Sequence, residues 1–158
     1  MKKLINYSLL FVIAVLSISC TKDSSSPSLV GKWSFTADGT KGTGSTIVWT
    51  PISSNACDIQ NYTEFVSNGT VSGQSYYTNS TGACVLYVDP TPTSSSETWL
   101  RSGDDIVITT SDFTVTPTQV DTVKAHIVSL TDSELILQFY DFTTNTNLID
   151  VYYKLSRR

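Results

Sequence analysis

Few residues in this chain combine the type and the spacing that catalysis requires. The single histidine, His126, lies between Ala125 and Ile127 in a run typical of a β-strand, and no nucleophile motif lies near it. Asp104 and Asp105 could act as a general acid and base, but they fall in a predicted hairpin turn, where aspartate is favoured for its own backbone hydrogen bonds. No metal-ligand spacing appears. The sequence therefore predicts a protein that is not an enzyme and that holds no metal and no cofactor.

Cys20 is informative because of the residues that precede it. Met1-Lys2-Lys3 gives a positive start, residues 4–18 are almost uninterruptedly apolar, and Ser19 stands directly before the cysteine. A basic start, a short apolar stretch and a small residue at the cut define a secretory signal. The apolar run is shorter than the roughly 20 residues that a transmembrane helix needs. Residues 1–19 are therefore predicted to be a cleaved signal peptide, and an ordinary signal with an incidental cysteine is the alternative.

The segment around Cys20 resembles the lipobox of bacterial lipoproteins, in which a small residue precedes a cysteine that receives diacylglycerol and becomes the new N-terminus. Ser19 and Cys20 match, whereas Ser17 departs from the usual branched aliphatic residue. The resemblance implies that Cys20 is lipidated, and more than one acyl chain makes such anchoring stable. Residues 20–28 would then form a polar, flexible tether. We expect an exported protein that is lipid-anchored to the outer membrane, on its periplasmic or cell-surface face.

The other two cysteines, Cys57 and Cys84, remain as a pair if Cys20 is acylated. In an oxidising compartment such a pair persists as a disulfide. A metal site or a reactive thiol is the alternative, but the chain has no CxxC motif, and His126 is its only histidine. A structural disulfide between Cys57 and Cys84 is the prediction.

Charge and composition narrow the class of protein and of partner. The formal net charge is −4, and without Lys2 and Lys3 the mature chain has 10 − 2 = 8 basic residues against 14 acidic ones, near −6. Nucleic acid is excluded as a partner because that balance repels a polyanion. Charged residues make up 15% and aromatic residues 11%, which favours half-buried sheets. Residues 29–158 are predicted to form one all-β domain, expected to be monomeric.

Short β-rich runs separated by turn residues would position these side chains. Asn68-Gly69 is the strongest hairpin signal, since both central positions of a type I′ turn need positive φ; Asp38-Gly39 predicts another turn, and residues 102–105 a further hairpin. The expected strands are 30–37, 46–50, 62–67, 70–78, 84–88, 97–101, 106–110, 112–116, 120–130, 134–142 and 148–156. The last three favour a meander. The spacing predicts an antiparallel up-and-down barrel of about eight to ten strands, with a sandwich as the alternative.

The period of two along a strand predicts which side chains face inward. Leu135, Leu137 and Phe139 share one face of their strand, and Trp33 and Phe35 alternate with polar residues on theirs. The candidate cavity-lining residues are the inward aromatics Trp33, Phe35, Phe65, Trp99, Phe139 and Tyr153, with Trp49, Tyr76 and Tyr77 as candidate rim contacts. The alternative is that the inward aromatics fill the interior as a core.

The run Leu29-Val30-Gly31-Lys32-Trp33 resembles the Gly-x-Trp opening of lipocalins and of their bacterial lipocalin-like relatives. In that family the tryptophan closes the bottom of the barrel and is stacked against an arginine from the last strand. The resemblance assigns these roles to Trp33 and to Arg157 (or Arg158). A guanidinium on an indole contributes about 0.5–2 kcal/mol.

Further motifs extend the resemblance to lipocalin-like lipoproteins of Gram-negative bacteria. They are Cys57-Asp58, Phe65 through Gly69-Thr70, Trp99 and Leu100 before Gly103-Asp104, and Tyr153 through Arg157. The Thr-Asp-Tyr motif and the C-terminal helix of animal lipocalins are missing, so the identity of a ligand does not carry over. The resemblance implies the fold, an interior cavity and a surface-anchored location.

Two functions are compatible with such a domain. The first is binding of a small apolar ligand inside the barrel, because an eight-stranded barrel has room for its side chains and one small ligand. The second is a packed barrel that contacts a surface protein or a glycan through its loops, mainly residues 39–45 and 89–96. The volume of the cavity discriminates between the two.

Overall fold

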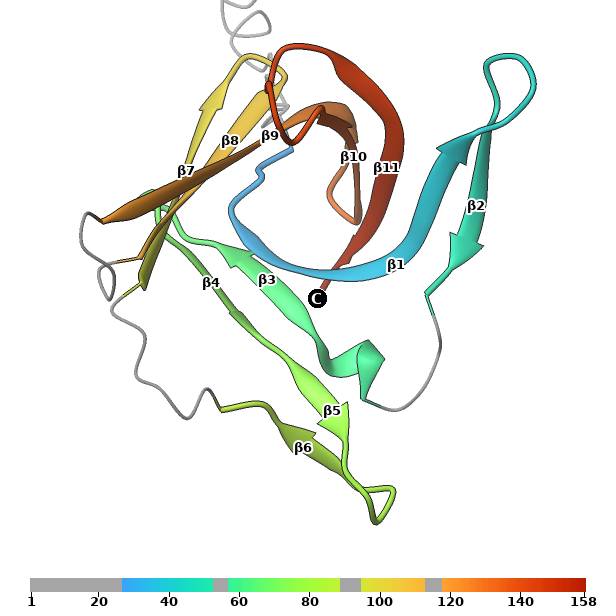
Figure 1. Cartoon of the computed structure of the whole chain (residues 1–158). Helices are drawn as coiled ribbons and strands as arrows, with labels where there is room; N and C mark the ends of the chain where they lie inside the picture. Colours follow the sequence, from blue (N-terminus) through green and yellow to red (C-terminus); the bar gives the residue numbers. More distant parts are fainter. Residues whose placement is uncertain (1–26, 53–56, 89–94, 113–117) are drawn as a thin grey trace, which may run out of the picture.

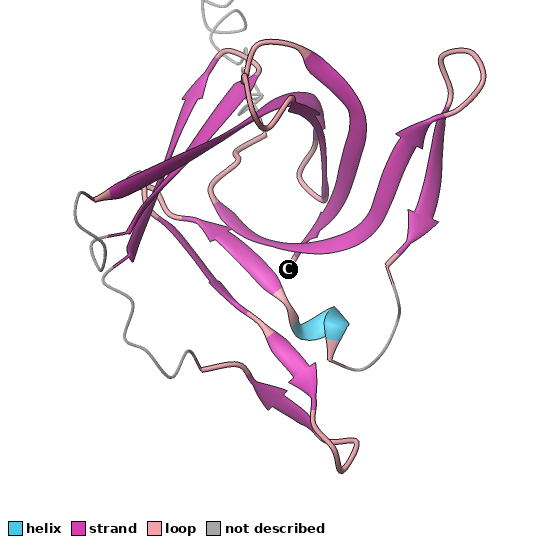
Figure 2. Ribbon diagram, viewed as in Figure 1, coloured by secondary structure: helices cyan, strands magenta, loops and turns pink. Residues whose placement is uncertain are grey.

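The computed structural model describes residues 27–52, 57–88, 95–112 and 118–158 of the chain (Figure 1). Cys20, the predicted signal peptide and most of the strand expected at 112–116 lie outside the described residues. The described part is all-β apart from one 3-10 turn, η1 (Asp58–Gln60), as Figure 2 shows. The strands are β1 (Gly31–Lys41), β2 (Ile47–Pro51), β3 (Tyr62–Phe65), β4 (Val71–Gln74), β5 (Tyr76–Thr78), β6 (Cys84–Leu86), β7 (Ser95–Ser102), β8 (Asp105–Asp112), β9 (Gln119–Leu130), β10 (Glu134–Tyr140) and β11 (Leu148–Arg157).

Eight of the described strands follow one another around a nearly closed antiparallel barrel, in the order β4-β3-β1-β11-β10-β9-β8-β7. Strands β9, β10 and β11 form the predicted meander. Between β4 and β7 the described residues form one bridge, Thr70 to Thr98, beside which the Trp99 amide donates to the Gly69 carbonyl over 2.8 Å. Figure 1 shows this ring of strands seen along its axis. The prediction of a barrel is confirmed.

Strand β1 is longer than the sequence predicts, because the turn expected at Asp38-Gly39 does not form. Both residues continue β1, where Asp38 pairs with Tyr153 of β11 and Thr50 of β2. The chain turns later, where the Gly42 amide donates to the Thr46 carbonyl over 2.9 Å. Pairing along both edges of β1 outweighs the local turn preference of an Asp-Gly pair. The resulting β1–β2 hairpin extends beyond the ring (Figure 1).

The second hairpin forms at the predicted place with a different turn. Asn68-Gly69 does join β3 to β4, but only Gly69 has positive φ, 86°, so the predicted type I′ turn is wrong. The Gly69 amide donates to the Val66 carbonyl over 3.0 Å, and the Asn68 carboxamide oxygen accepts from the Thr70 amide over 3.0 Å. This is a turn followed by a left-handed glycine, in which the Asn side chain binds the backbone of its own loop.

The strand expected at 70–78 divides at Ser75 into β4 and β5. Strand β4 stays in the barrel, whereas β5 pairs with β6 in a separate two-stranded sheet. The β5–β6 hairpin projects from the barrel (Figure 1).

The hydrophobic core lies inside the ring. Leu135, Leu137 and Phe139 alternate with half-buried residues along β10, as the period of two predicts. Trp33, Ile106, Leu135 and Leu155 are the largest fully buried side chains among the described residues. No helix in the described part of the chain is long and apolar enough to cross a membrane.

Candidate functional site

One end of the barrel is closed by Trp33 and Arg157. Trp33 is fully buried, and its indole nitrogen Nε1 donates to the Leu29 carbonyl over 2.8 Å. The guanidinium carbon of Arg157 lies 4.5 Å from the centroid of the Trp33 ring. The same guanidinium donates to the carbonyl of Val30 over 3.1 Å and to that of Ser28. The start of β1 and the end of β11 are thus joined over one indole.

Gly31 provides the space for this closure. A Cβ at position 31 would lie 2.8 Å from Nη1 of Arg157, and the φ of Gly31 is +136°, where glycine is strongly favoured. Glycine is favoured at this position of the Gly-x-Trp run mainly by its backbone conformation, because the flexible end of the Arg157 side chain can move away from a Cβ. Arg158, the other candidate for this role, lies over the ring of Tyr62 instead, at 5.3 Å.

Inside the barrel lies an apolar cavity of 80 Å³. Its walls come from six strands, and the lining residues are Phe35, Thr63, Phe65, Ile106, Ile108, Val123, Ala125, Leu137, Phe139 and Leu155. The volume is about half of the roughly 150 Å³ that holds a benzene molecule. Side chains therefore fill most of the interior, and the remaining space suits only a small apolar group.

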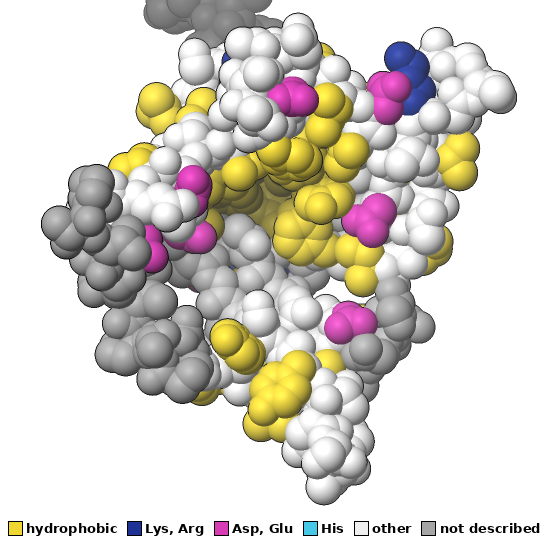
Figure 3. Space-filling model, in the orientation of Figure 1, with side chains coloured by type: hydrophobic (Ala, Val, Ile, Leu, Met, Phe, Trp, Pro, Cys, Tyr) yellow, Lys and Arg dark blue, Asp and Glu magenta, His cyan; other side chains and the backbone are white. Residues whose placement is uncertain are grey.

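A second, more open pocket of 280 Å³ lies at the open end of the barrel, and we call it the mouth pocket. Its lining residues are Phe35, Asp38, Ile52, Asp58, Asn61 and Tyr153. Phe35 lines both this pocket and the interior cavity, and its ring meets that of Tyr153 edge to face at 5.3 Å. The two spaces therefore adjoin at an aromatic pair. Figure 3 shows the hydrophobic hollow at this end.

A bulge in β1 brings Asp38 to the mouth pocket. Phe35 and Asp38 are three residues apart, a spacing that places side chains on opposite faces of a regular strand. The register with β11 shifts between Phe35, which pairs with Leu155, and Ala37, which pairs with Lys154. The extra residue, Thr36, restores the face, so that Phe35 and Asp38 line the same pocket.

The opposite wall of the mouth pocket is held by a disulfide, since Cys57 is bonded to Cys84 with 5.2 Å between their Cα atoms. This confirms the predicted pairing. Asp58 follows Cys57 directly and begins η1. The Asn61 carbonyl accepts from the Ser34 hydroxyl over 2.8 Å, and its side-chain oxygen accepts from the Tyr76 amide. These contacts fix Asp58 and Asn61 against β1 and the β5–β6 hairpin.

The structure brings four of the six predicted lining residues to the two pockets: Phe35, Phe65, Phe139 and Tyr153. Trp33 belongs to the closed end. Trp99 lines neither pocket, because its indole donates to the Val66 carbonyl over 3.0 Å and its ring packs on Phe65 at 5.5 Å. Both tryptophans therefore seal the barrel instead of lining a cavity.

The three aromatic residues predicted to contact a ligand at the rim, Trp49, Tyr76 and Tyr77, do not line the mouth pocket either. The ammonium of Lys154 lies over the ring of Trp49, at 4.7 Å. Tyr76 and Tyr77 belong to the β5–β6 hairpin, where the ring of Tyr77 packs on that of Tyr87 at 6.4 Å.

Residues 29–137 match the family of the lipocalin-like domain. The chain belongs to this family. No curated protein matches its sequence. Among solved structures, that of an uncharacterised protein from Bacteroides eggerthii DSM 20697 aligns with a TM-score of 0.43 and 13% identity, over 83% of this chain and 100% of that chain.

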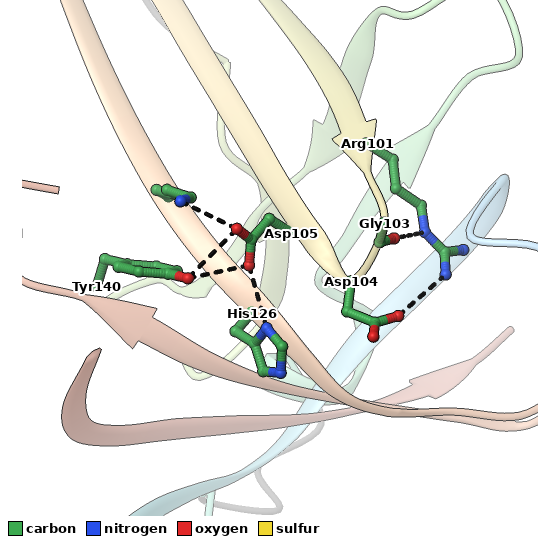
Figure 4. A network of polar contacts seen from close by, with 7 residues as sticks. Arg101, Gly103, Asp104, Asp105, His126 and Tyr140 are labelled. Atoms are coloured by element: carbon green, nitrogen blue, oxygen red, sulfur yellow. Dashed lines mark hydrogen bonds and ion pairs between the residues drawn. The ribbon is translucent and has the colours of Figure 1, made fainter. Parts of the chain in front are cut away.

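The outer wall of this lipocalin-like barrel carries a polar cluster around Asp105, shown in Figure 4. The Asp105 carboxylate lies 3.0 Å from Nζ of Lys124 and 3.1 Å from Nδ1 of His126, and it accepts from the Tyr140 hydroxyl over 3.1 Å. The Lys124 ammonium also lies 4.1 Å from the centroid of the Tyr140 ring. Asp104, which precedes Asp105, lies in the turn, 3.9 Å from the guanidinium of Arg101.

Partial burial opposes ionisation of Asp105, but the hydrogen bonds from Lys124, His126 and Tyr140 outweigh it, so the pKa of Asp105 is lowered. The hydrogen bond to Asp105 in turn raises the pKa of Lys124. Both charges are therefore held firmly at neutral pH, as in a cross-strand ion pair that stabilises a sheet. Among the described residues, no group of three or more His, Cys, Asp or Glu side chains could hold a metal ion.

Proposed function

We propose that this lipocalin-like protein is an exported, lipid-anchored binding protein, not an enzyme, and that it takes a small apolar ligand at the open end of its barrel. The observation that supports this most strongly is the pair of adjoining pockets, 280 Å³ at the mouth and 80 Å³ inside, which share Phe35. A concave, mostly apolar space at the mouth of a barrel is a preferred place for ligands.

The volumes limit the size of the ligand. Ligand pockets usually measure about 300–1,000 Å³, and the mouth pocket lies at the lower edge of that range. The interior cavity admits only a small apolar group. A compact molecule with one apolar end therefore fits better than a sterol or a haem, which would require the interior to be repacked.

The position of the N-terminal segment indicates how the mouth is presented. Ser28 and Leu29 are bound at the closed end, by Arg157 and by Trp33. The proposed tether joins the barrel at that end. Its seven residues from Cys20 to Ser26 span at most about 25 Å when fully extended. With an anchor on Cys20, the closed end faces the membrane and the mouth faces away from it.

The disulfide supports the proposed compartment, because such bonds persist in exported proteins. Cys20 lies outside the described residues, so the lipid anchor rests on the lipobox resemblance. An acyl mass on Cys20 in the protein extracted from cells would support the anchor.

Filling the interior cavity tests the proposed function. Ala125→Leu adds three carbon atoms to a residue that lines this cavity, and we expect it to weaken binding at least tenfold while the melting temperature is kept. Leu100→Ala, at a position 70% exposed on β7, is the control. Native mass spectrometry of the full chain extracted in detergent would detect a co-purified ligand in the parent and in the control, and none in Ala125→Leu. Equal occupancy in all three proteins, or none in the parent, would refute binding in the barrel.

A further inference from the structure

The lining of the mouth pocket specifies the charge of the ligand, if the chain is the binding protein proposed above. Two carboxylates, Asp38 and Asp58, share the lining with the aromatic rings of Phe35 and Tyr153. Asn61 and Ile52 complete it, and neither is charged. No Lys or Arg is among the described residues that line this pocket. A ligand bound here therefore meets negative charge and aromatic surface together.

Acidic side chains outnumber basic ones around the pocket, although the Arg158 guanidinium donates to the Gln60 carbonyl over 2.9 Å, between the lining residues Asp58 and Asn61. Figure 3 shows Asp and Glu side chains spaced around the hydrophobic hollow, with few Lys or Arg side chains on this face. Lys41, near the tip of the β1–β2 hairpin, lies 3.9 Å from Asp150, which offsets its charge. The net charge of the whole chain is −4. The field at the mouth attracts cations and repels anions.

Carboxylates beside aromatic rings are the groups that bind organic cations. A carboxylate accepts charge-assisted hydrogen bonds from an ammonium, and the faces of aromatic rings attract the same cation. A fatty acid or another anionic amphiphile would instead bring its own carboxylate against Asp38 and Asp58, and juxtaposed like charges disfavour a partner strongly. The bulge in β1 has a role in this selection, since without it Asp38 would not face the pocket.

We propose that the mouth pocket takes an organic cation, an amine or quaternary ammonium group on a compact apolar body. The cationic head lies between Asp38 and Asp58, and the apolar end points past Phe35 toward the interior cavity. Both carboxylates and both rings belong to the pocket that the structure describes.

Three probes with one apolar body and three charges test this proposal: phenylbutylamine, phenylbutanol and phenylbutyrate. Each is titrated calorimetrically into the full chain in non-ionic detergent, with a detergent blank. We expect the amine to bind at least tenfold more tightly than the alcohol, and the acid to bind most weakly. If the alcohol or the acid binds as tightly as the amine, the inference is wrong and the proposed function stands. If none of the three binds, both are wrong.

Variants identify the groups that select the charge. Asp38→Asn keeps the size of the side chain at an exposed strand position, and we expect it to reduce the preference for the amine over the alcohol at least threefold. Asp132→Asn, in the exposed turn between β9 and β10, makes the same change of net charge away from the pocket and should leave the preference unchanged. Equal losses in the two variants would mean that net charge, and not the mouth pocket, selects the cation, which would overturn the proposal. Circular dichroism and the melting temperature confirm that both variants are folded.

Discussion

Arg157, the last residue of β11, covers the indole of Trp33 near the start of β1, so the two ends of the described domain meet on one pair of side chains. The guanidinium also holds the carbonyls of Ser28 and Val30. One residue therefore supports the first strand, the segment before it and the last strand together. The stability of the barrel should depend on Arg157 more than on any exposed arginine.

Replacing Arg157 by alanine is expected to lower the free energy of unfolding by about 1–3 kcal/mol, because it uncovers the Trp33 ring and leaves two carbonyls without their donor. Arg101→Ala, near the end of β7, removes an exposed cation and should cost about 0.5 kcal/mol or less. Gly31→Ala should cost about 1–3 kcal/mol through its backbone conformation, and less in an Arg157→Ala background, where the clash with Nη1 is relieved. Urea denaturation measures the free energy of unfolding of the three single variants and of the Gly31→Ala/Arg157→Ala double variant. Equal losses from Arg157→Ala and Arg101→Ala would contradict the role of the closure.

The disulfide predicts a second loss. Cys57 and Cys84 are 27 residues apart, and opening a loop of that size lowers the free energy of unfolding by about 3–4 kcal/mol in the chain-entropy model. The variant Cys57→Ser/Cys84→Ser should show this loss in urea denaturation. A reducing agent should destabilise the parent protein to the same extent and leave the variant unchanged. If the reducing agent destabilises both proteins equally, the loss comes from another source.

The polar cluster on the outer wall predicts how stability depends on pH. The pKa of Asp105 is lowered from its ordinary value of 3.8 by Lys124, His126 and Tyr140, against the effect of partial burial. A lowered folded-state pKa contributes stability that is complete above about 3.8 and is lost as the pH falls through the folded-state value. Asp105→Asn should therefore cost about 1 kcal/mol near neutral pH and progressively less at an acidic pH below about 3.8. Asp132→Asn is the control, and thermal melts at the two pH values are the measurement. A loss from Asp105→Asn that is the same at both pH values would exclude the charge as its cause.

The lipid anchor predicts a change of location. Cys20→Ser removes the sulfur that would carry the acyl chains, and we expect the protein to move from the membrane pellet to the soluble fraction after cell lysis. Ser26→Ala, in the same tether, should leave the protein in the pellet. Immunoblots of the membrane pellet and of the soluble fraction measure how each variant is distributed. Retention of the Cys20→Ser protein in the membrane would refute the anchor.

Local signals predicted much of the fold. The meander from β9 to β11 and the hairpin at residues 102–105 formed where the alternation and the turn residues placed them. The same holds for the inward face of β10, because a period of two needs no knowledge of the partner strand. The resemblance to lipocalins supplied the pairing of Trp33 with Arg157, which no local pattern contains.

The mouth pocket could not be predicted in the same way. The sequence predicts a turn at Asp38, because an Asp-Gly pair favours turns locally, and only pairing with β2 and β11 makes this residue part of a strand. The bulge that turns it toward Phe35 is a property of the register between two strands, which the sequence of one strand does not reveal. Asp58 and Asn61 reach the pocket through a disulfide and a 3-10 turn. The one available signal was that Asp58 follows a cysteine expected to be bonded.

The seam between β4 and β7 has a mechanical consequence. Along the rest of the ring, neighbouring strands are joined by continuous ladders of at least three residue pairs, whereas between β4 and β7 the described residues form one isolated bridge, beside the Asn68-Gly69 loop. A barrel with this gap can widen if β4 moves away from β7, and such a movement breaks none of the hydrogen-bonded ladders between the other strands. The capacity of the interior is then set by the distance between two strand edges as well as by the size of the side chains. Amide hydrogens of β3 and β4 should exchange with solvent faster than those of β10.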